Sequence, residues 1–353
     1  MLTKKRYSVK DMVLWTRGET LIYLLYAAII TILYKVFGFT FLNVPWTPVA
    51  LIGTAVAFLV GFQNNSAYGR IWEARMIWGA IVNTSRTWGM KVQDMVTNEH
   101  SKPKVSEGEI MQHKKVLIYR HIAWMTALRY AMRQRKSWET QHKAKTNREW
   151  SNMIHIPEEV STLEDNLMLY LSDEEEKYVL SKNNRQTALL YLQSKHIREL
   201  KEKGLIWEFA FLELENVLES LFTHQGKSER IKNFPYPRQY ASLGLYLTRV
   251  FTILLPFGLI PEFAEIGETM VGDFFLVGKY FIWIAIPFCA VVSWAFHTME
   301  RLARTGENPF EGGPNDVPIS TISRGIEIDL RQMLDENHDD IPSQFPEEKN
   351  VQM

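Results

Sequence analysis

The chain has 353 residues, in which 40 lysines and arginines balance 40 aspartates and glutamates. This balance provides no basic field that would favour nucleic acid as a partner. The single cysteine, Cys289, excludes an intrachain disulfide and a metal site built from several cysteines. Hydrophobic residues make up 46% of the chain and are gathered in a few segments, so their distribution decides the class of protein.

Four apolar segments are candidates for crossing a membrane. They are residues 21–42, 49–62, 241–263 and 274–296. Three of them exceed the ~20 residues that a spanning helix needs, although Lys35, Arg249 and Lys279 interrupt them. The second segment is shorter, and it spans only if the uncharged polar residues up to Tyr68 extend the helix inside a protein interior. The sequence therefore predicts a helical membrane protein with four spans.

Charged residues orient the four segments. Basic residues precede the first segment and follow the second and the fourth, whereas the loop of the first hairpin carries no charge. The loop between the third and fourth segments is acidic, with Glu262, Glu265, Glu268 and Asp273. By the positive-inside rule, both termini and the middle of the chain are expected to face the cytoplasm.

This orientation divides the chain into five parts. They are a cytosolic N-terminal segment (1–20), a first transmembrane hairpin (21–63), a cytosolic helical region (64–240), a second transmembrane hairpin (241–296) and a cytosolic C-terminal segment that ends in a mobile acidic tail (297–353). Breaker residues predict loops at 98–109, 146–160 and 224–237, and the last of these returns the chain to the membrane.

The second segment carries two neighbouring stripes of residues at four-residue spacing. One consists of small residues that let helices approach closely, Gly53, Ala57 and Gly61. The other projects about 100° further round the helix and consists of Thr54, Phe58 and Phe62. Bulky residues at this spacing usually pack against lipid or another helix. Repeated around a symmetry axis, they would instead form a dry constriction that gates by dewetting.

Polar and charged residues follow this stripe directly. Asn64 and Asn65 come first, and Glu73 could pair with Arg70 at a spacing of three residues, which would satisfy charges that are costly alone near a membrane. A second interpretation is an interfacial belt of tryptophans, made of Trp72, Trp78 and Trp88. The spacing alone favours the belt.

Four sequence blocks resemble the bestrophin family, specifically its bacterial branch. They are GFQNNSAYGRIWEARMIWGAIVNTSR, SERIKNFPYPRQYA, WAFHTMERLA and ENPFEGGPNDVPI, in this order over nearly the whole chain. The resemblance implies an all-α membrane protein with four transmembrane helices per subunit and a large cytosolic helical body, assembled with four identical subunits into a homopentamer around a central pore. It implies a channel in the bacterial inner membrane, not an enzyme, with no cofactor. The family generally conducts chloride and other small anions, and some bacterial members pass cations.

The resemblance also assigns residues to the pore. The pore neck of the family consists of three apolar residues at four-residue spacing beside the Gly-Phe that precedes the Asn pair, and these positions are Thr54, Phe58 and Phe62 here. Animal members carry apolar residues at all three levels, so Thr54 makes the outer ring more polar. The cytosolic aperture of the family falls near Leu212, to within a turn of helix.

In animal members, an acidic run directly after Asn-Pro-Phe holds calcium. Here Asn308 begins the same motif, but the residues that follow Phe310 contain only two scattered carboxylates, Glu311 and Asp316. Calcium requires about six to eight oxygen ligands, several of them anionic. We therefore expect this loop to clasp subunits together without binding calcium, and we expect no other metal site.

Ion selectivity depends on two opposed features. Phenylalanine rings that present their positive edges to a pore favour anions. The acidic loop that contains Glu262 and Glu268 would instead concentrate cations if it lined the entrance. The sequence favours an anion channel and leaves a cation-selective channel open. It also leaves open a non-conducting membrane scaffold whose helical body binds a cytosolic partner, whereas a secondary transporter is disfavoured because no internal repeat is visible.

Overall fold

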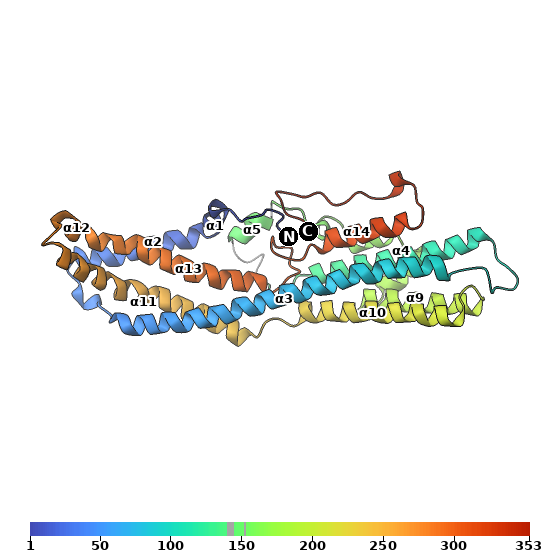
Figure 1. Cartoon of the computed structure of the whole chain (residues 1–353), viewed down its shortest axis with the longest axis horizontal. Coiled ribbons are helices and arrows are strands. Elements are labelled where there is room, and N and C mark those ends of the chain that lie inside the picture. Colours follow the sequence, from blue (N-terminus) through green and yellow to red (C-terminus); the bar gives the residue numbers. More distant parts are fainter. Residues whose placement is uncertain (140–144, 152) are drawn as a thin grey trace.

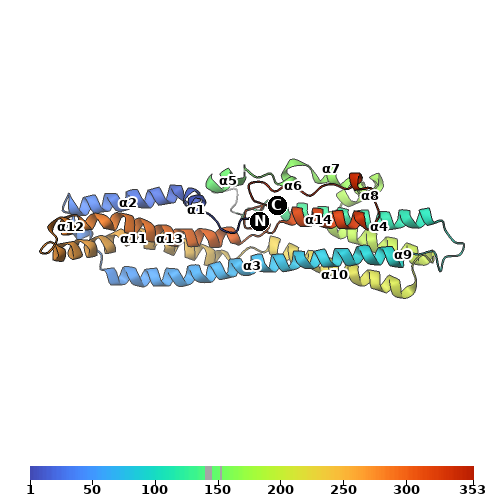
Figure 2. The same ribbon diagram turned by 45° about the horizontal axis from the view of Figure 1, so that its top comes forward.

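The computed structural model describes residues 1–139, 145–151 and 153–353. This part of the chain is elongated and helical, and two bundles of helices lie end to end in it (Figure 1). One helix, α3 (Trp46–Met95), runs through both bundles. The N-terminus and the C-terminus lie close together near the junction of the bundles (Figure 2).

The apolar bundle contains four helical segments long and apolar enough to cross a membrane, at the four places that the sequence predicts. They are α2 (Arg17–Lys35), the first half of α3, α11 (Arg238–Met270) and the run of α12 (Phe275–Tyr280), η2 (Phe281–Ile284) and α13 (Ala285–Gly306). A short 3-10 helix, η1 (Thr40–Leu42), lies between α2 and α3. No proline follows Pro48 within α3, so no residue of this kind breaks the helix. The helix therefore continues past residue 63, where the sequence analysis places the end of the first transmembrane hairpin.

Glycine and proline residues allow close contacts within the apolar bundle. A Cβ atom on Gly53 would lie 2.7 Å from the ring of Phe251, so glycine allows α3 and α11 to approach. Pro261 cannot donate a hydrogen bond to the carbonyl of Phe257, which instead accepts one from the backbone of Val44 at 3.1 Å. Pro261 thus leaves the carbonyl of Phe257 free to accept a hydrogen bond from the loop that leads into α3.

The fourth membrane segment is interrupted for a similar reason. Pro287 lacks the N–H that would bond to the carbonyl of Trp283, and the preceding turn is a 3-10 helix. At the tip of this hairpin, a Cβ on Gly278 would lie 2.6 Å from the carbonyl oxygen of Gly267. The two glycines therefore let α12 pack directly on the end of α11.

The polar bundle surrounds the second half of α3. Its long helices are α4 (Glu107–Arg133), α9 (Arg185–Glu202), α10 (Glu208–Asn233) and α14 (Ile319–Gln332). Short helices on its sides are α6 (Pro157–Val160), α7 (Leu163–Leu167), α8 (Asp173–Leu180) and η3 (His338–Asp340). Two further short helices, α1 (Val9–Trp15) and α5 (Lys145–Ser151), lie beside the ends of α2 and α13. Fully buried Trp78, Trp88 and Trp124 lie in one large core formed by the helices of the polar bundle.

The predicted tryptophan belt is wrong for two of its three members. Trp78 and Trp88 are completely buried in the polar bundle, because α3 continues into this bundle and does not end at a membrane surface. The predicted pairing of Glu73 with Arg70 is also wrong. Glu73 pairs with Arg230 of α10. Arg70 donates to the carbonyls of three other residues, Glu307 (2.6 Å), Ile231 (2.8 Å) and Phe234 (3.0 Å).

All three predicted loops are partly helical, and residues 107–109 of the first belong to the start of α4. Residues 146–160 include α5 and α6, and the described part of this stretch excludes residue 152. Helix α10 continues to Asn233 through Gly226, so the turn back to the apolar bundle is confined to residues 234–237. The glycine is tolerated because the helix packs along α3 on its other side.

The C-terminal tail is packed more closely than its composition predicts. Val351 and Met353 are buried, and Val351 forms an isolated β-bridge with Leu2. The backbone N–H of Thr321 donates to the carbonyl of Met353. These contacts join the two ends of the chain to the start of α14.

Candidate functional site

One face of α3 is exposed along the apolar bundle. The rings of Phe58 and Phe62 are 66% and 68% exposed, and Thr54 is exposed on the same face. The opposite face is buried against α11 and α13, with Val56 and Val60 almost fully covered. The predicted neck residues therefore share one uncovered stripe on a helix that is otherwise packed.

This stripe continues into the polar bundle. At about 100° per residue, Asn65, Trp72 and Met76 fall within the same arc of roughly 80° as Thr54 and Phe62. Asn65 is exposed, and Trp72 and Met76 are 52% and 61% exposed. The ring of Tyr68 stacks on Trp72 with a centroid distance of 6.3 Å. The exposed apolar surface of α3 thus extends well beyond the apolar bundle.

The two polar residues after the stripe have different roles. The side-chain amide of Asn64 donates to the carbonyls of Val60 at 2.9 Å and Met299 at 3.0 Å, so it fastens α3 to α13. Asn65 lies on the exposed stripe. The hydroxyl of Thr54 donates to the carbonyl of Ala50 at 3.0 Å, and its proton is therefore occupied within the helix.

The small-residue stripe is used at only one of its three positions within the described chain. Gly53 is in close contact with α11, whereas a Cβ on Gly61 would meet no atom within 4 Å, and Ala57 is exposed. On the buried side of α3, behind the predicted neck residues, the side chain of Gln63 donates to Glu307 at 3.2 Å. Arg238 lies 3.4 Å from the other oxygen of the same carboxylate. This buried group ties α3, next to the predicted neck residues, to α11 and to the end of α13.

The predicted aperture residue, Leu212, lies on α10 and is 50% exposed. The next residue, Glu213, pairs with Lys91 of α3 at 2.5 Å. Lys91 is about 44 Å along the axis of α3 from Phe62, at ~1.5 Å per residue. The neck and aperture candidates therefore belong to two well-separated levels of the molecule.

The loop after the Asn-Pro-Phe motif is closed by its own carboxylates. The amide of Asn308 donates to Glu311 at 2.6 Å. One oxygen of Asp316 accepts backbone hydrogen bonds from Gly312 and Gly313, each at 2.8 Å. Burial raises the pKa of Asp316 to about 6, although these backbone donors and Arg133 oppose the shift. Gly312 has a φ of +92°, which favours glycine.

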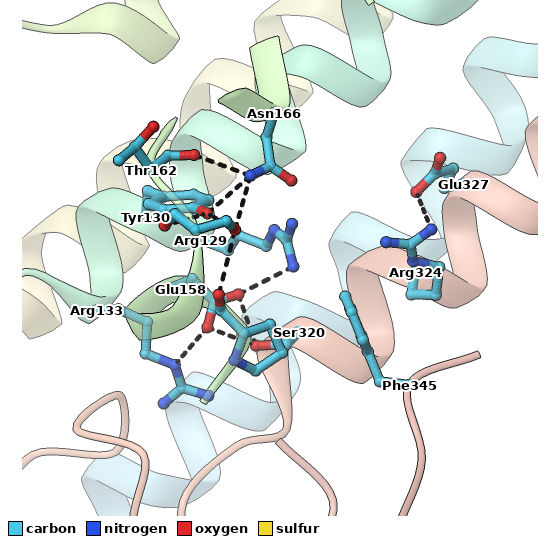
Figure 3. Close-up of polar contacts among 12 residues, drawn as sticks. Arg129, Tyr130, Arg133, Glu158, Thr162, Asn166, Ser320, Arg324, Glu327 and Phe345 are labelled. Atoms are coloured by element: carbon cyan, nitrogen blue, oxygen red, sulfur yellow. Dashed lines mark hydrogen bonds and ion pairs between the residues drawn. The ribbon is translucent and has the colours of Figure 1, made fainter. Parts of the chain in front are cut away.

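A buried ion cluster anchors this loop to the polar bundle, and sequence reasoning missed it. Arg133 of α4 donates to the carbonyl of Phe310 at 3.1 Å and also contacts Glu158 (Figure 3). Glu158, whose side chain is 1% exposed, accepts further hydrogen bonds from Arg129 and Ser320. The charged residues along α4 were the one feature of the sequence that could have indicated this cluster. Charge patterning cannot show that their partners are Glu158 and Ser320, which are distant in sequence. In the described part of the chain, no group of three or more His, Cys, Asp or Glu residues could hold a metal.

Several known proteins are similar to this chain over most of its length. The voltage-dependent anion channel-forming protein YneE of Escherichia coli (strain K12) is 25% identical over 327 residues, which cover 92% of this chain and 88% of that protein. The voltage-dependent anion channel-forming protein RSc3414 of Ralstonia nicotianae is 26% identical, with 83% and 79% covered.

A solved structure and a family model agree with these similarities. A bacterial bestrophin homologue from Klebsiella pneumoniae has the same fold, with a TM-score of 0.68 and 21% identity over 91% of this chain and 99% of the homologue. The family model for bacterial and fungal bestrophin proteins matches residues 9–332. The chain therefore belongs to the bestrophin family, a family of channels and not of enzymes, as its four sequence blocks predict.

Proposed function

We propose that this chain forms a homopentameric channel that conducts chloride and other small anions passively. The observation that carries the proposal is the exposed stripe of α3, where Phe58 and Phe62 are uncovered although the other face of the helix is buried. Lipid could cover these rings, but it cannot cover Trp72 and Met76 on the same face within the polar bundle. Copies of the chain arranged around an axis would cover the whole stripe.

In this assembly, Thr54, Phe58 and Phe62 form the neck of the pore. Five copies of each ring make a dry constriction, and ring edges turned toward the axis provide a partial positive charge for an anion. The hydroxyl proton of Thr54 is bonded within the helix, so the outer ring contributes mainly oxygen and methyl surface. Asn65 forms a polar ring directly below the neck, and Leu212 lines a second aperture further inside.

The positive-inside rule supports a location in the bacterial inner membrane with both termini in the cytoplasm. The polar bundle is then cytosolic, and the loop from Asn308 to Asp316 contributes to contacts between subunits. The names of the relatives in Escherichia coli and Ralstonia support anions as the conducted species. A cation-selective channel is the second candidate, because Glu262, Glu265 and Glu268 are exposed at the outer end of α11.

Two measurements test this proposal. Native mass spectrometry of the purified protein in detergent should give five chains per particle. Planar-bilayer recording should give unitary currents whose reversal potential in a chloride gradient lies near the chloride equilibrium potential. Unitary currents that reverse near the cation equilibrium would support the cation-selective candidate, and a protein that never conducts would support a membrane scaffold.

A further inference from the structure

A cavity of about 1010 Å³ opens in the side of the polar bundle. Its walls come from the end of α4, α6, the start of α7, the connection between α8 and α9, and the end of α10. None of its described lining residues belongs to α3 or to the loop after Asn308. A volume of this size matches the upper range of small-molecule sites, and the cavity is separate from the proposed ion pathway.

The side chains around this cavity carry an excess of positive charge. Its described cationic residues are Arg133, Arg135, Lys136, Lys182, Arg185 and Lys232. Its described carboxylates are Glu158, Glu159 and Glu229. Six positive charges against three negative ones leave a net charge of +3 on the lining, in a chain whose overall charge is balanced. This local excess attracts anions.

Two of the cations are available to a ligand. Four others are paired within the chain: Arg133 with Glu158, Arg135 with Glu159, Arg185 with Glu164, and Lys232 with Glu139. Lys136 and Lys182 form no ion pair with any residue that the structure describes. Lys182 is exposed to solvent, and its ammonium group lies over the Tyr178 ring, 4.6 Å from the ring centre.

Other groups of the cavity also bear on its attraction for an anionic ligand. The third carboxylate, Glu229, accepts three hydrogen bonds at Oε1 from the side-chain amides of Gln225 (2.9 Å), Gln186 (3.0 Å) and Asn184 (3.1 Å), so one of its two oxygens is engaged within the chain. Helix α9, with 18 residues, begins at this wall, and its positive end adds to the field of the lysines. Arg133, whose side chain is 4% exposed, lines the cavity and has one terminal nitrogen without a hydrogen-bond partner among the described residues.

From this geometry we propose that the cavity binds a small multivalent anion that carries phosphate groups, with Lys136 and Lys182 as its main contacts. A single halide ion is too small to contact both Lys136, which follows α4, and Lys182, in the connection before α9. Phosphate suits both the arginine side chains and a helix start, because each presents several N–H donors to one group. The site binds its ligand outside the pore, so it does not depend on conduction.

Isothermal titration of the full purified chain in detergent, with sodium tripolyphosphate as the probe, tests this site. We expect saturable binding at one site per chain. Lys136→Ala and Lys182→Ala should each weaken binding about tenfold, because each removes a charge-assisted contact. The double variant Lys136→Arg/Lys182→Arg should retain binding, which shows that loss in the alanine variants is not a folding defect.

A matched control removes two lysines elsewhere in the polar bundle. Lys104→Ala/Lys195→Ala lowers the net charge of the chain by the same amount and should leave binding unchanged. Equal loss in this control and in the double alanine variant would overturn the proposal, since general charge attraction would explain both. Absence of saturable binding would also overturn it, as would equal affinity for orthophosphate and tripolyphosphate. None of these outcomes affects the proposed channel, because the titration measures no current.

Discussion

The acidic end of α11 allows a quantitative test of what determines selectivity. Glu262, Glu265 and Glu268 are exposed on the last turns of this helix, and their replacement by glutamine removes three negative charges per subunit. If these residues control which ion passes, their neutralisation should change the sign of the reversal potential. If the neck controls it, conductance should change and the sign should not.

The structure gives the distance over which these charges act. Phe251 is level with Gly53, and Glu262 lies about 16 Å beyond Phe251 at ~1.5 Å per residue. Phe58 lies about 8 Å in the opposite direction along α3. The nearest of the carboxylates is therefore separated from the middle of the neck by about 24 Å along the axis, or roughly three Debye lengths at physiological salt.

At this distance one unscreened charge in water contributes about 0.2 kcal/mol, and screening reduces that value roughly twentyfold. In the proposed pentamer, three carboxylates per subunit then change the energy of an ion in the proposed neck by about 0.1 kcal/mol, which corresponds to about 4 mV. We predict that the triple glutamine variant shifts the reversal potential by no more than several millivolts. Its main effect should be a changed conductance at low salt, where screening is weakest.

The assay is planar-bilayer recording of wild type and variant in the same salt gradient. Phe58→Glu is the positive control, because it brings a negative charge into the neck itself and should shift the reversal potential strongly toward the cation equilibrium. A triple glutamine variant whose reversal potential changes sign would refute this reasoning. Selectivity would then arise in the outer entrance, and the neck would serve only as a constriction.

Four further predictions follow from single contacts. Phe58→Ala should raise conductance with little effect on stability, since the ring is exposed, whereas Phe288→Ala on α13 should leave conductance unchanged in the same recordings. Calcium chelation should not alter open probability, and a steep rise at micromolar calcium would contradict the closed loop around Asp316. Arg70→Ala should lower the free energy of unfolding by about 3 kcal/mol, measured by denaturation in detergent, because three carbonyls lose a charged donor. Burial lowers the pKa of His121 to about 3, so the unfolded chain binds more protons below pH ~6.5. The wild type should therefore lose up to about 1.4 kcal/mol per pH unit as pH falls, and His121→Phe should lose less in acid melting curves.

The membrane segments were predictable because their signal is local. A run of apolar residues longer than ~20 is sufficient to identify a span, whatever its neighbours in space. The uninterrupted length of α3 was only partly predictable, since a span requires the helix to extend through the polar residues 63–68, but no local signal shows that it continues to Met95. The helical structure of these polar residues depends on partners distant in sequence, such as Glu307 for Gln63 and Met299 for Asn64.

Charge pairs were poorly predicted for the same reason. A spacing of three residues allows Glu73 to reach Arg70, but such a pair contributes only about 0.2–0.5 kcal/mol on a helix surface. Arg70 instead donates to carbonyl groups at the ends of α10 and α13, which would otherwise lack partners. A local pairing rule fails where a tertiary contact satisfies more groups, and this applies equally to the cluster around Glu158.

The ambiguity of the neck stripe and the wrong assignment of the tryptophans have one origin. Spacing alone could not distinguish a lipid-facing row of phenylalanines from a row that faces a symmetry axis, because both expose the same surface in a single chain. The distinction requires knowledge of where the apolar bundle ends. If Trp72 belonged to an interfacial belt, the stripe would end at the membrane and lipid would suffice to cover it. Because Trp78, six residues later, is fully buried among the helices of the polar bundle, Trp72 and Met76 lie where only protein can cover them. The position of these two side chains, more than the phenylalanines themselves, therefore favours a symmetric assembly around α3.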